Sequence, residues 1–159
     1  MILCKDKKLL FVAVPKTGST SIGRTLRGVL GNQNCIRHFR GSYHLTAKVL
    51  KDISFKENDL CWESYFKFAF VRNPWCIAVS SYHYVIKTLE NFSDPKFLPM
   101  WKKQCSTVLD AAGKPLSFKE LLTSDKFPWF CEPQNLWTHN ADGDTLLDFI
   151  GRFENPVSY

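Results

Sequence analysis

Short apolar runs that lead into polar turns, followed by segments with helical spacing, recur along the chain. The clearest run is residues 9–14, where six apolar side chains in a row precede a lysine, a glycine and four hydroxyl side chains within positions 16–21. The sequence after these hydroxyls is helix-forming. This order predicts a buried strand, a tight loop and the N-terminus of a helix.

A second apolar run covers residues 65–71 and ends in a polar turn. Phenylalanines alternate at positions 66, 68 and 70, and the opposite face is also apolar apart from Lys67. A strand that is apolar on both faces is typical of a parallel sheet. Asn73 is a favourable N-cap and Pro74 a favourable first helical residue, so a helix is expected to follow at once.

The remaining pattern predicts alternating strands and helices. We expect strands at 35–39 and 146–153, a short helix at 46–53, and a helix at 117–123 that opens with a capping box of Ser117 and Glu120. Between them, residues 91–115 are loop-like, with room for a helix at 96–104. The chain is therefore predicted to be a single α/β domain over residues 1–159.

The loop after the first long strand has the chemistry of a phosphate cradle. The first N–H groups of a helix are free of intrahelical partners, and the helix dipole favours negative charge there. Lys16 adds a positive charge and Gly18 allows close approach of the backbone. The candidate anion-binding residues are Lys16, Thr17, Gly18, Ser19, Thr20 and Ser21. The loop differs from the common nucleotide loop, in which lysine follows the second glycine. An ordinary strand-to-helix turn with a solvated lysine is the alternative.

A second anion site is predicted where the 65–71 strand ends. Arg72 leaves that strand at the carboxyl edge of the sheet, and Ser80 lies eight positions further on in the next helix. The two side chains can converge on one phosphate, and the planar fork of arginine suits an oxyanion. The alternatives are a surface ion pair for Arg72 and simple packing on a helix face for Ser80.

Together these segments resemble the sulfotransferases. The sequence PKTGSTS after a strand, FVRNPW with its serine eight places past the arginine, and DFIGRFEN at 148–155 are similar to the carbohydrate branch of that family. The resemblance implies a P-loop-like three-layer fold with a central, mainly parallel β-sheet flanked by helices. It implies 3′-phosphoadenosine 5′-phosphosulfate as sulfuryl donor and a hydroxyl acceptor, on a carbohydrate, with no metal. By the same resemblance, residues 16–21 hold the 5′-phosphosulfate end, and Arg72 and Ser80 hold the 3′-phosphate.

Transfer to a hydroxyl needs a base, and histidine titrates near working pH. Of the four histidines, His44 lies between the two phosphate motifs and just before a predicted helix, as in the resembling enzymes. We therefore predict His44 as the base and Lys16 as the group that stabilises charge on the leaving phosphate. The alternative for His44 is packing at a helix start. His38, His83 and His139 are interpreted as structural or loop residues.

Composition adds few constraints. The net charge of +6 favours anionic ligands by long-range attraction. The six cysteines are scattered, without the spacing of a zinc site, and free thiols are the favoured interpretation. No run of apolar residues is long enough to span a membrane, so a cytoplasmic location is expected, with the Golgi lumen as the alternative if an N-terminal anchor has been removed.

Two other function classes remain open. One is a different nucleotide-dependent phosphotransferase, and the other is a non-catalytic module that binds anions or polyanions. A nucleic-acid partner is not expected for the enzyme, and the sequence does not reveal the oligomeric state. Relatives usually continue past the 148–155 motif, so the chain is expected to lack the usual C-terminal portion.

Overall fold

A computed structural model of the chain describes residues 1–90, 108–124 and 131–155. The described residues group into two compact units, Met1–Asn73 with Pro133–Tyr159 and Pro74–Glu132, and each unit is described by itself. The expected helix at 96–104 lies outside the described residues. The single-domain organisation stays a prediction.

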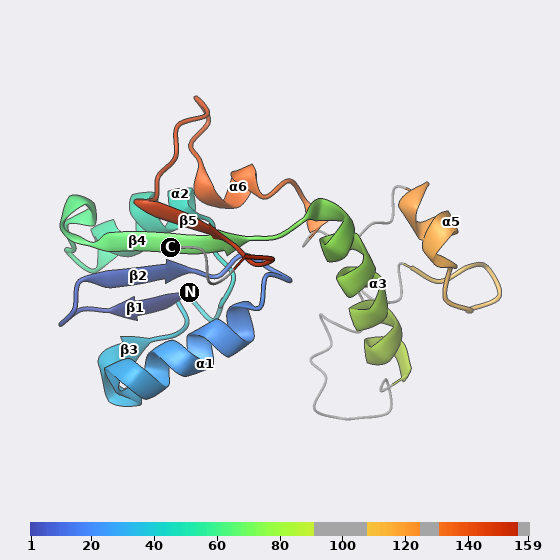
Figure 1. Cartoon of the computed structure of the whole chain (residues 1–159), viewed down its shortest axis with the longest axis horizontal. Coiled ribbons are helices and arrows are strands. Elements are labelled where there is room, and N and C mark those ends of the chain that lie inside the picture. Colours follow the sequence, from blue (N-terminus) through green and yellow to red (C-terminus); the bar gives the residue numbers. More distant parts are fainter. Residues whose placement is uncertain (91–107, 125–130, 156–159) are drawn as a thin grey trace. The chain divides into compact units, whose positions relative to one another are not determined.

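A five-stranded sheet in the order β3-β1-β2-β4-β5 forms the centre of the first unit (Figure 1). The strands are β1 Ile2–Cys4, β2 Leu9–Val12, β3 Cys35–Ile36, β4 Phe66–Val71 and β5 Phe149–Arg152. The pairs β2–β4 and β4–β5 are parallel, whereas β1 is antiparallel to both β2 and β3. The sheet is therefore mixed, and the expectation of a mainly parallel sheet is corrected. The difference comes from β1, a three-residue apolar run too short to show a period.

Each face of this sheet packs its own cluster of side chains. The strand register aligns Ile2 with Phe11 and Phe11 with Phe68, so these residues share one face. Ile22 and Leu26 of helix α1 (Ser19–Leu30) pack against that face. The helix begins where the sequence predicts it, directly after Gly18.

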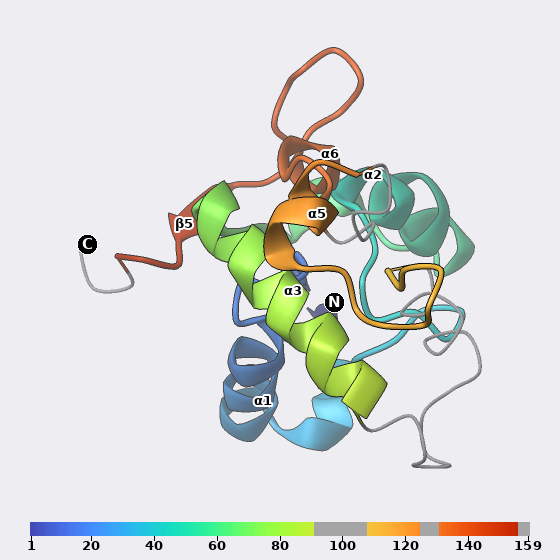
Figure 2. The same cartoon turned by 90° about the vertical axis from the view of Figure 1, so that its right-hand side faces the viewer.

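The opposite face is built around aromatic edge-to-face contacts. Phe55 packs its ring against Trp62 and Tyr65, with centroids 4.9 and 5.0 Å away. These rings follow helix α2 (Ala47–Val49), which continues into a π-helical turn η2 (Leu50–Phe55), so the predicted helix at 46–53 is present. The views in Figures 1 and 2 place α1 and α2 on opposite sides of the sheet. Three shorter helical segments complete the unit: η1 Asn32–Asn34, η3 Trp62–Ser64 and α6 Asn135–Thr138.

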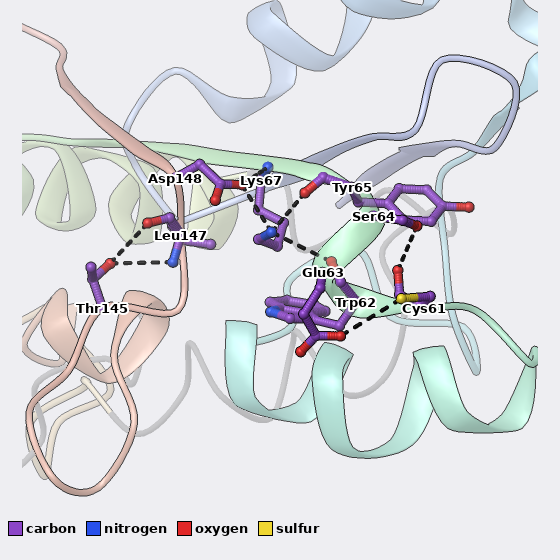
Figure 3. Close-up of polar contacts among 9 residues, drawn as sticks. All are labelled: Cys61, Trp62, Glu63, Ser64, Tyr65, Lys67, Thr145, Leu147 and Asp148. Atoms are coloured by element: carbon purple, nitrogen blue, oxygen red, sulfur yellow. Dashed lines mark hydrogen bonds and ion pairs between the residues drawn. The ribbon is translucent and has the colours of Figure 1, made fainter.

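Lys67 is buried in this second face, although the sequence marks it only as the polar exception in an apolar strand. Its Nζ donates to the Tyr65 carbonyl at 2.6 Å and lies 2.9 Å from a carboxylate oxygen of Asp148 (Figure 3). The same carboxylate accepts the Lys67 backbone N–H at 2.7 Å. Burial by itself raises the pKa of Asp148, but the hydrogen bonds and charge of Lys67 outweigh it and hold that pKa below its ordinary value of 3.8. A buried ammonium therefore fastens the start of β4 to the start of β5.

Replacing Asp148 with asparagine is expected to lower the free energy of unfolding by about 1 kcal/mol at neutral pH. The variant leaves the Lys67 ammonium buried without its counter-charge, and the half-exposed position of Asp148 keeps the loss small. The stabilisation depends on an ionised carboxylate, so it is complete above about pH 4 and disappears as pH falls through the lowered folded pKa. Urea unfolding of both proteins between pH 3 and 7 measures the difference. A gap that stays constant down to pH 3 contradicts the assignment.

The second unit contains helix α3 (Pro74–Glu90) and helix α5 (Phe118–Leu122), which contact each other through the rings of Tyr82 and Phe118, with centroids 5.3 Å apart. Val85, Val108 and Leu121 form its buried cluster. Helix α3 begins at Pro74 as predicted. The capping box is also confirmed: the Ser117 hydroxyl accepts from the Glu120 N–H and the Glu120 carboxylate accepts from the Ser117 N–H.

Candidate functional site

The loop between β2 and α1 has a backbone that few side chains favour. Lys16 has a φ of 62° and Gly18 a φ of 73°, both in the left-handed region. The Thr17 hydroxyl turns inward and donates to the Val14 carbonyl at 2.9 Å. Thr17 is fully buried and anchors the loop through its side chain, so its hydroxyl is not available as a donor to an anion.

The N-terminus of α1 follows this loop without a side-chain cap. Gly18 stands at the N-cap position and its carbonyl accepts the first helical bond, from Ile22 at 3.1 Å. Ser19 is buried, whereas Thr20 and Ser21 are exposed in the first turn. An α-helix leaves its first N–H groups without intrahelical partners, and these groups attract anions. The start of α1 therefore presents free N–H groups beside the loop, and binding of a phosphate there stays a prediction.

Arg72 reaches this loop from the end of β4. Its Nη1 donates to the Lys16 carbonyl at 3.2 Å, and its guanidinium carbon lies 4.7 Å from the centre of the Phe153 ring. Its Nε is buried and has no hydrogen-bond partner among the described residues. A buried guanidinium N–H without a partner is costly, and an anion would satisfy it. The structure thus brings Arg72 and the Lys16 loop together.

Phe153 also packs directly over Gly18. A Cβ added to Gly18 would lie 2.6 Å from the edge of the Phe153 ring. Gly18 is therefore required both for its backbone conformation and for the close approach of this ring.

Gly18→Ala is expected to lower the free energy of unfolding by about 1–2 kcal/mol for the left-handed backbone, with a further loss from displacement of Phe153. The double variant Gly18→Ala/Phe153→Leu should regain the steric part and retain the backbone part. Chemical denaturation of the two single variants and the double variant measures both parts. Strict additivity of the two changes would show that the ring and the added methyl do not meet.

Two side chains from distant parts of the sequence hold the backbone after β4. The Gln134 side-chain amide accepts the Arg72 N–H at 2.7 Å and donates to the Arg72 carbonyl at 2.6 Å. The Glu154 carboxylate accepts the Asn73 N–H at 2.7 Å. Sequence analysis did not select Gln134, Phe153 or Glu154 as site residues. Phe153 and Glu154 belong to the RFEN sequence at 152–155, which supported the family resemblance but did not indicate a role for either side chain.

His44 lies beside the strand that leads into the loop. Its Nδ1 is 2.7 Å from the Ala13 carbonyl oxygen, and its ring packs edge-on against Tyr43 and Trp137. A carbonyl oxygen can only accept, so Nδ1 carries the proton and Nε2 carries the lone pair in the neutral ring. Tyr43 in turn donates its hydroxyl to the Ser19 carbonyl at 2.8 Å, which ties this segment to the start of α1.

Burial is the main influence on the protonation of His44, and it lowers the pKa of the ring below 6.5. The hydrogen bond to Ala13 opposes this effect, and the positive charge of Lys16 adds to it. The ring is therefore neutral at pH 7, the form that can accept a proton.

Ser80 lies in α3, which belongs to the second unit, where its side chain is half-buried. Joint binding of one phosphate by Arg72 and Ser80 stays a prediction. The neighbouring Ser81 hydroxyl is buried without a hydrogen-bond partner among the described residues. Of the other histidines, His38 and His83 are exposed and His139 contacts the Thr138 hydroxyl.

The described residues contain neither a cluster of metal ligands nor a membrane-spanning helix. No group of three or more histidine, cysteine, aspartate or glutamate side chains in the described ranges could hold a metal ion. None of the described helices has the length and apolar character needed to cross a membrane.

Comparison with known proteins assigns the chain to a family. A model described as the sulfotransferase family matches residues 1–144, which include the loop at 16–21, His44, Arg72 and Ser80. The motif at 148–155 lies beyond the matched residues. The comparisons with curated proteins and with solved structures found no match. The match covers most of the chain and includes the loop and the arginine beside it. The chain therefore belongs to the sulfotransferase family.

Proposed function

We propose that this sulfotransferase-family protein takes its sulfuryl group from 3′-phosphoadenosine 5′-phosphosulfate and transfers it to a carbohydrate hydroxyl. The observation that carries the proposal is the position of Arg72. Its guanidinium contacts the Lys16 carbonyl, and its Nε is buried without a partner among the described residues. The proposal includes a P-loop-like arrangement, in which the first loop receives the 5′ end of the donor.

The two ends of such a donor need two separate groups of hydrogen-bond donors. Lys16, Gly18 and the first turn of α1 would hold the 5′-phosphosulfate end, with Ser19, Thr20 and Ser21 supplying backbone and hydroxyl donors. Arg72 would hold the 3′-phosphate together with Ser80. Arginine binds phosphate oxygens in a planar fork, and the guanidinium carbon of Arg72 lies over the Phe153 ring. This donor set is rich in N–H groups and positive charge, as a doubly phosphorylated nucleotide requires.

Proton transfer is assigned to His44. The Ala13 carbonyl fixes Nδ1–H, so Nε2 is the nitrogen that would accept the proton of the attacking hydroxyl. The positive charge of Lys16 would stabilise the charge that develops on the phosphate oxygen as the sulfuryl group leaves. The bound donor supplies a sulfuryl group already activated by its anhydride. No redox step is required.

A carbohydrate acceptor is supported by the resemblance of residues 68–75 and 148–155 to the carbohydrate branch of the family. The positive net charge of +6 also favours acidic glycans. Loops build acceptor pockets, so the sugar and the sulfated position are left to experiment.

The deciding experiment compares two ligands and then measures transfer. Isothermal titration with adenosine 3′,5′-bisphosphate is expected to show binding that is tighter than binding of ATP with magnesium. Transfer of labelled sulfate from the donor to a panel of glycans and small alcohols then identifies the acceptor. Preference for ATP with magnesium would favour a phosphotransferase. Polymer binding that collapses with salt and ignores the small donor would favour a non-catalytic polyanion-binding module.

A further inference from the structure

We propose that Gln134 is a positioning residue, which fixes the backbone of Arg72 so that its guanidinium can recognise the 3′-phosphate. This inference rests on the proposed function, and it adds a residue that acts through Arg72 without touching the donor.

The side-chain amide of Gln134 hydrogen-bonds to the backbone of Arg72 as a neighbouring strand would. Arg72 is the first residue beyond β4, and the Gln134 amide satisfies both its N–H and its carbonyl at 2.7 and 2.6 Å. A primary amide offers one acceptor and two donors, so it can bind a residue as a neighbouring strand would. Gln134 itself is anchored, because its carbonyl accepts the Trp137 N–H at 3.0 Å and Trp137 is buried.

The side chain of Arg72 needs this support. Its guanidinium contacts the Lys16 carbonyl and the Phe153 ring, whereas its backbone is held by the Gln134 amide. Movement of the Cα would therefore carry the guanidinium away from the loop. Misplacement of a binding group by about 1 Å can cost about 10²-fold in rate. Loss of the Gln134 hydrogen bonds to the Arg72 backbone should therefore weaken binding of the 3′-phosphate more than binding of the rest of the donor.

The test uses the whole chain, two ligands and a matched control. Affinities for adenosine 3′,5′-bisphosphate and for adenosine 5′-monophosphate are measured by titration calorimetry in the wild type, in Gln134→Met and in Gln33→Met. Gln33 is an exposed glutamine of η1. We expect Gln134→Met to lose about tenfold in bisphosphate affinity and less than twofold in monophosphate affinity, and Gln33→Met to match the wild type.

Each other result overturns the inference. If Gln134→Met loses the same factor in affinity for both ligands, or if neither affinity changes, Gln134 does not position Arg72. Thermal melting checks that the variants are folded. If Gln134→Met does not fold, Gln134→Asn replaces it. The same affinity changes are expected, because the asparagine amide is one methylene too short to reach the Arg72 backbone. If the wild type itself shows no preference for the bisphosphate, the proposed function fails at that step, before any variant is compared.

A second observation, independent of the donor site, concerns Cys4 and Cys35. We infer that these two thiols form an intramolecular disulfide when the protein meets a small-molecule disulfide such as oxidised glutathione. In the structure both are free thiols, as are the exposed Cys61 and Cys76.

Strand pairing places the two thiols together. Cys4 of β1 and Cys35 of β3 are directly opposite each other in the antiparallel register. Opposite residues in such a pair have Cα atoms about 4.5–5.5 Å apart and side chains on the same face, which suits a disulfide. Burial raises the pKa of the Cys35 thiol, and a hydrogen bond with the Cys4 thiol raises it further. The two sulfurs are therefore neighbours, and the reaction should be slow at neutral pH and faster as pH rises.

The chemistry balances in two exchange steps. The Cys35 thiolate attacks one sulfur of oxidised glutathione, which forms a mixed disulfide and releases one glutathione. Cys4 then loses its proton and attacks the Cys35 sulfur, which releases the second glutathione. The protein loses two hydrogens and the small disulfide is reduced to two thiols. The new bond encloses β2, the Lys16 loop and α1.

Non-reducing peptide mapping after incubation with oxidised glutathione tests this inference. We expect a Cys4–Cys35 linked peptide, a melting temperature raised by several degrees through the loop closure, and neither effect in Cys35→Ser. The exposed-cysteine variant Cys61→Ser is the matched control and should retain both effects. Recovery of Cys35 only as a glutathione adduct, or linked to a different cysteine, overturns the inference.

Discussion

Lys16→Ala is expected to lower kcat for sulfuryl transfer by about 10²–10³-fold and to leave the fold intact. A preorganised positive group that meets developing charge contributes roughly this much to the rate, because it needs no reorganisation during the reaction. Lys16 is half-buried in the loop before α1, and its charge already influences His44. Its removal should therefore affect the reaction more than donor binding. The measurement is the initial rate of labelled sulfate transfer at saturating donor, together with a thermal melt.

A matched lysine provides the control for this prediction. Lys7 is exposed in the turn between β1 and β2, at the opposite end of β2 from the Lys16 loop. Lys7→Ala removes the same net charge and should keep the wild-type rate within about twofold, since an exposed charge at that distance is largely screened. Near-normal turnover in Lys16→Ala argues against the assigned role. Equal losses in both variants would assign the effect to long-range steering by net charge.

Local sequence was sufficient to predict the strand, the loop and the helix start at the candidate site, because their characteristic residues are adjacent in the chain. The loop at 15–18 and the start of α1 follow from an apolar run, a glycine and hydroxyl side chains, and the structure has both. The proximity of Arg72 to Lys16 follows from the strand order, because β2 and β4 are parallel neighbours and their carboxyl ends meet at one edge. This strand pairing places the Arg72 guanidinium beside the backbone of the Lys16 loop.

The support for Arg72 could not be predicted in the same way. Gln134 lies far along the chain from Arg72. No periodicity or spacing in the sequence indicates that its amide binds the Arg72 backbone. The burial of Lys67 was hidden for a similar reason. Its partner Asp148 comes from the strand next to it in space, so only the β4–β5 pairing reveals why a lysine is tolerated there. Side chains that satisfy a distant backbone depend on topology, which the local pattern does not encode.

The mixed sheet shows the limit of periodicity itself. A three-residue apolar segment such as β1 gives too few positions to separate a strand from a short buried turn. Its pairing with both β2 and β3 nevertheless decides the sheet topology and brings Cys4 opposite Cys35. The strand β1 was therefore not predicted from the sequence, although it decides the topology of the sheet.

His44→Asn is expected to lower kcat by about 10²–10⁴-fold, the usual contribution of a general base. Asparagine is the informative replacement because its side-chain N–H group can take the place of Nδ1–H and keep the bond to the Ala13 carbonyl, while Nε2 is removed. His38 is exposed in the same unit, so His38→Asn is the matched control and should retain wild-type activity. Initial rates and thermal melts of the two variants separate loss of the base from loss of the fold.

The pH profile provides a sharper test of the same residue. Burial lowers the pKa of His44 below 6.5, so the neutral ring persists into mildly acidic solution. Only the neutral ring can accept a proton; wild-type kcat/KM should therefore be level near pH 7 and fall as pH drops through that lowered pKa. The small residual activity of His44→Asn should lack this acid limb, because the titrating group is gone. An acid limb of unchanged midpoint in the variant would assign the titration to another group and remove His44 from the role of base.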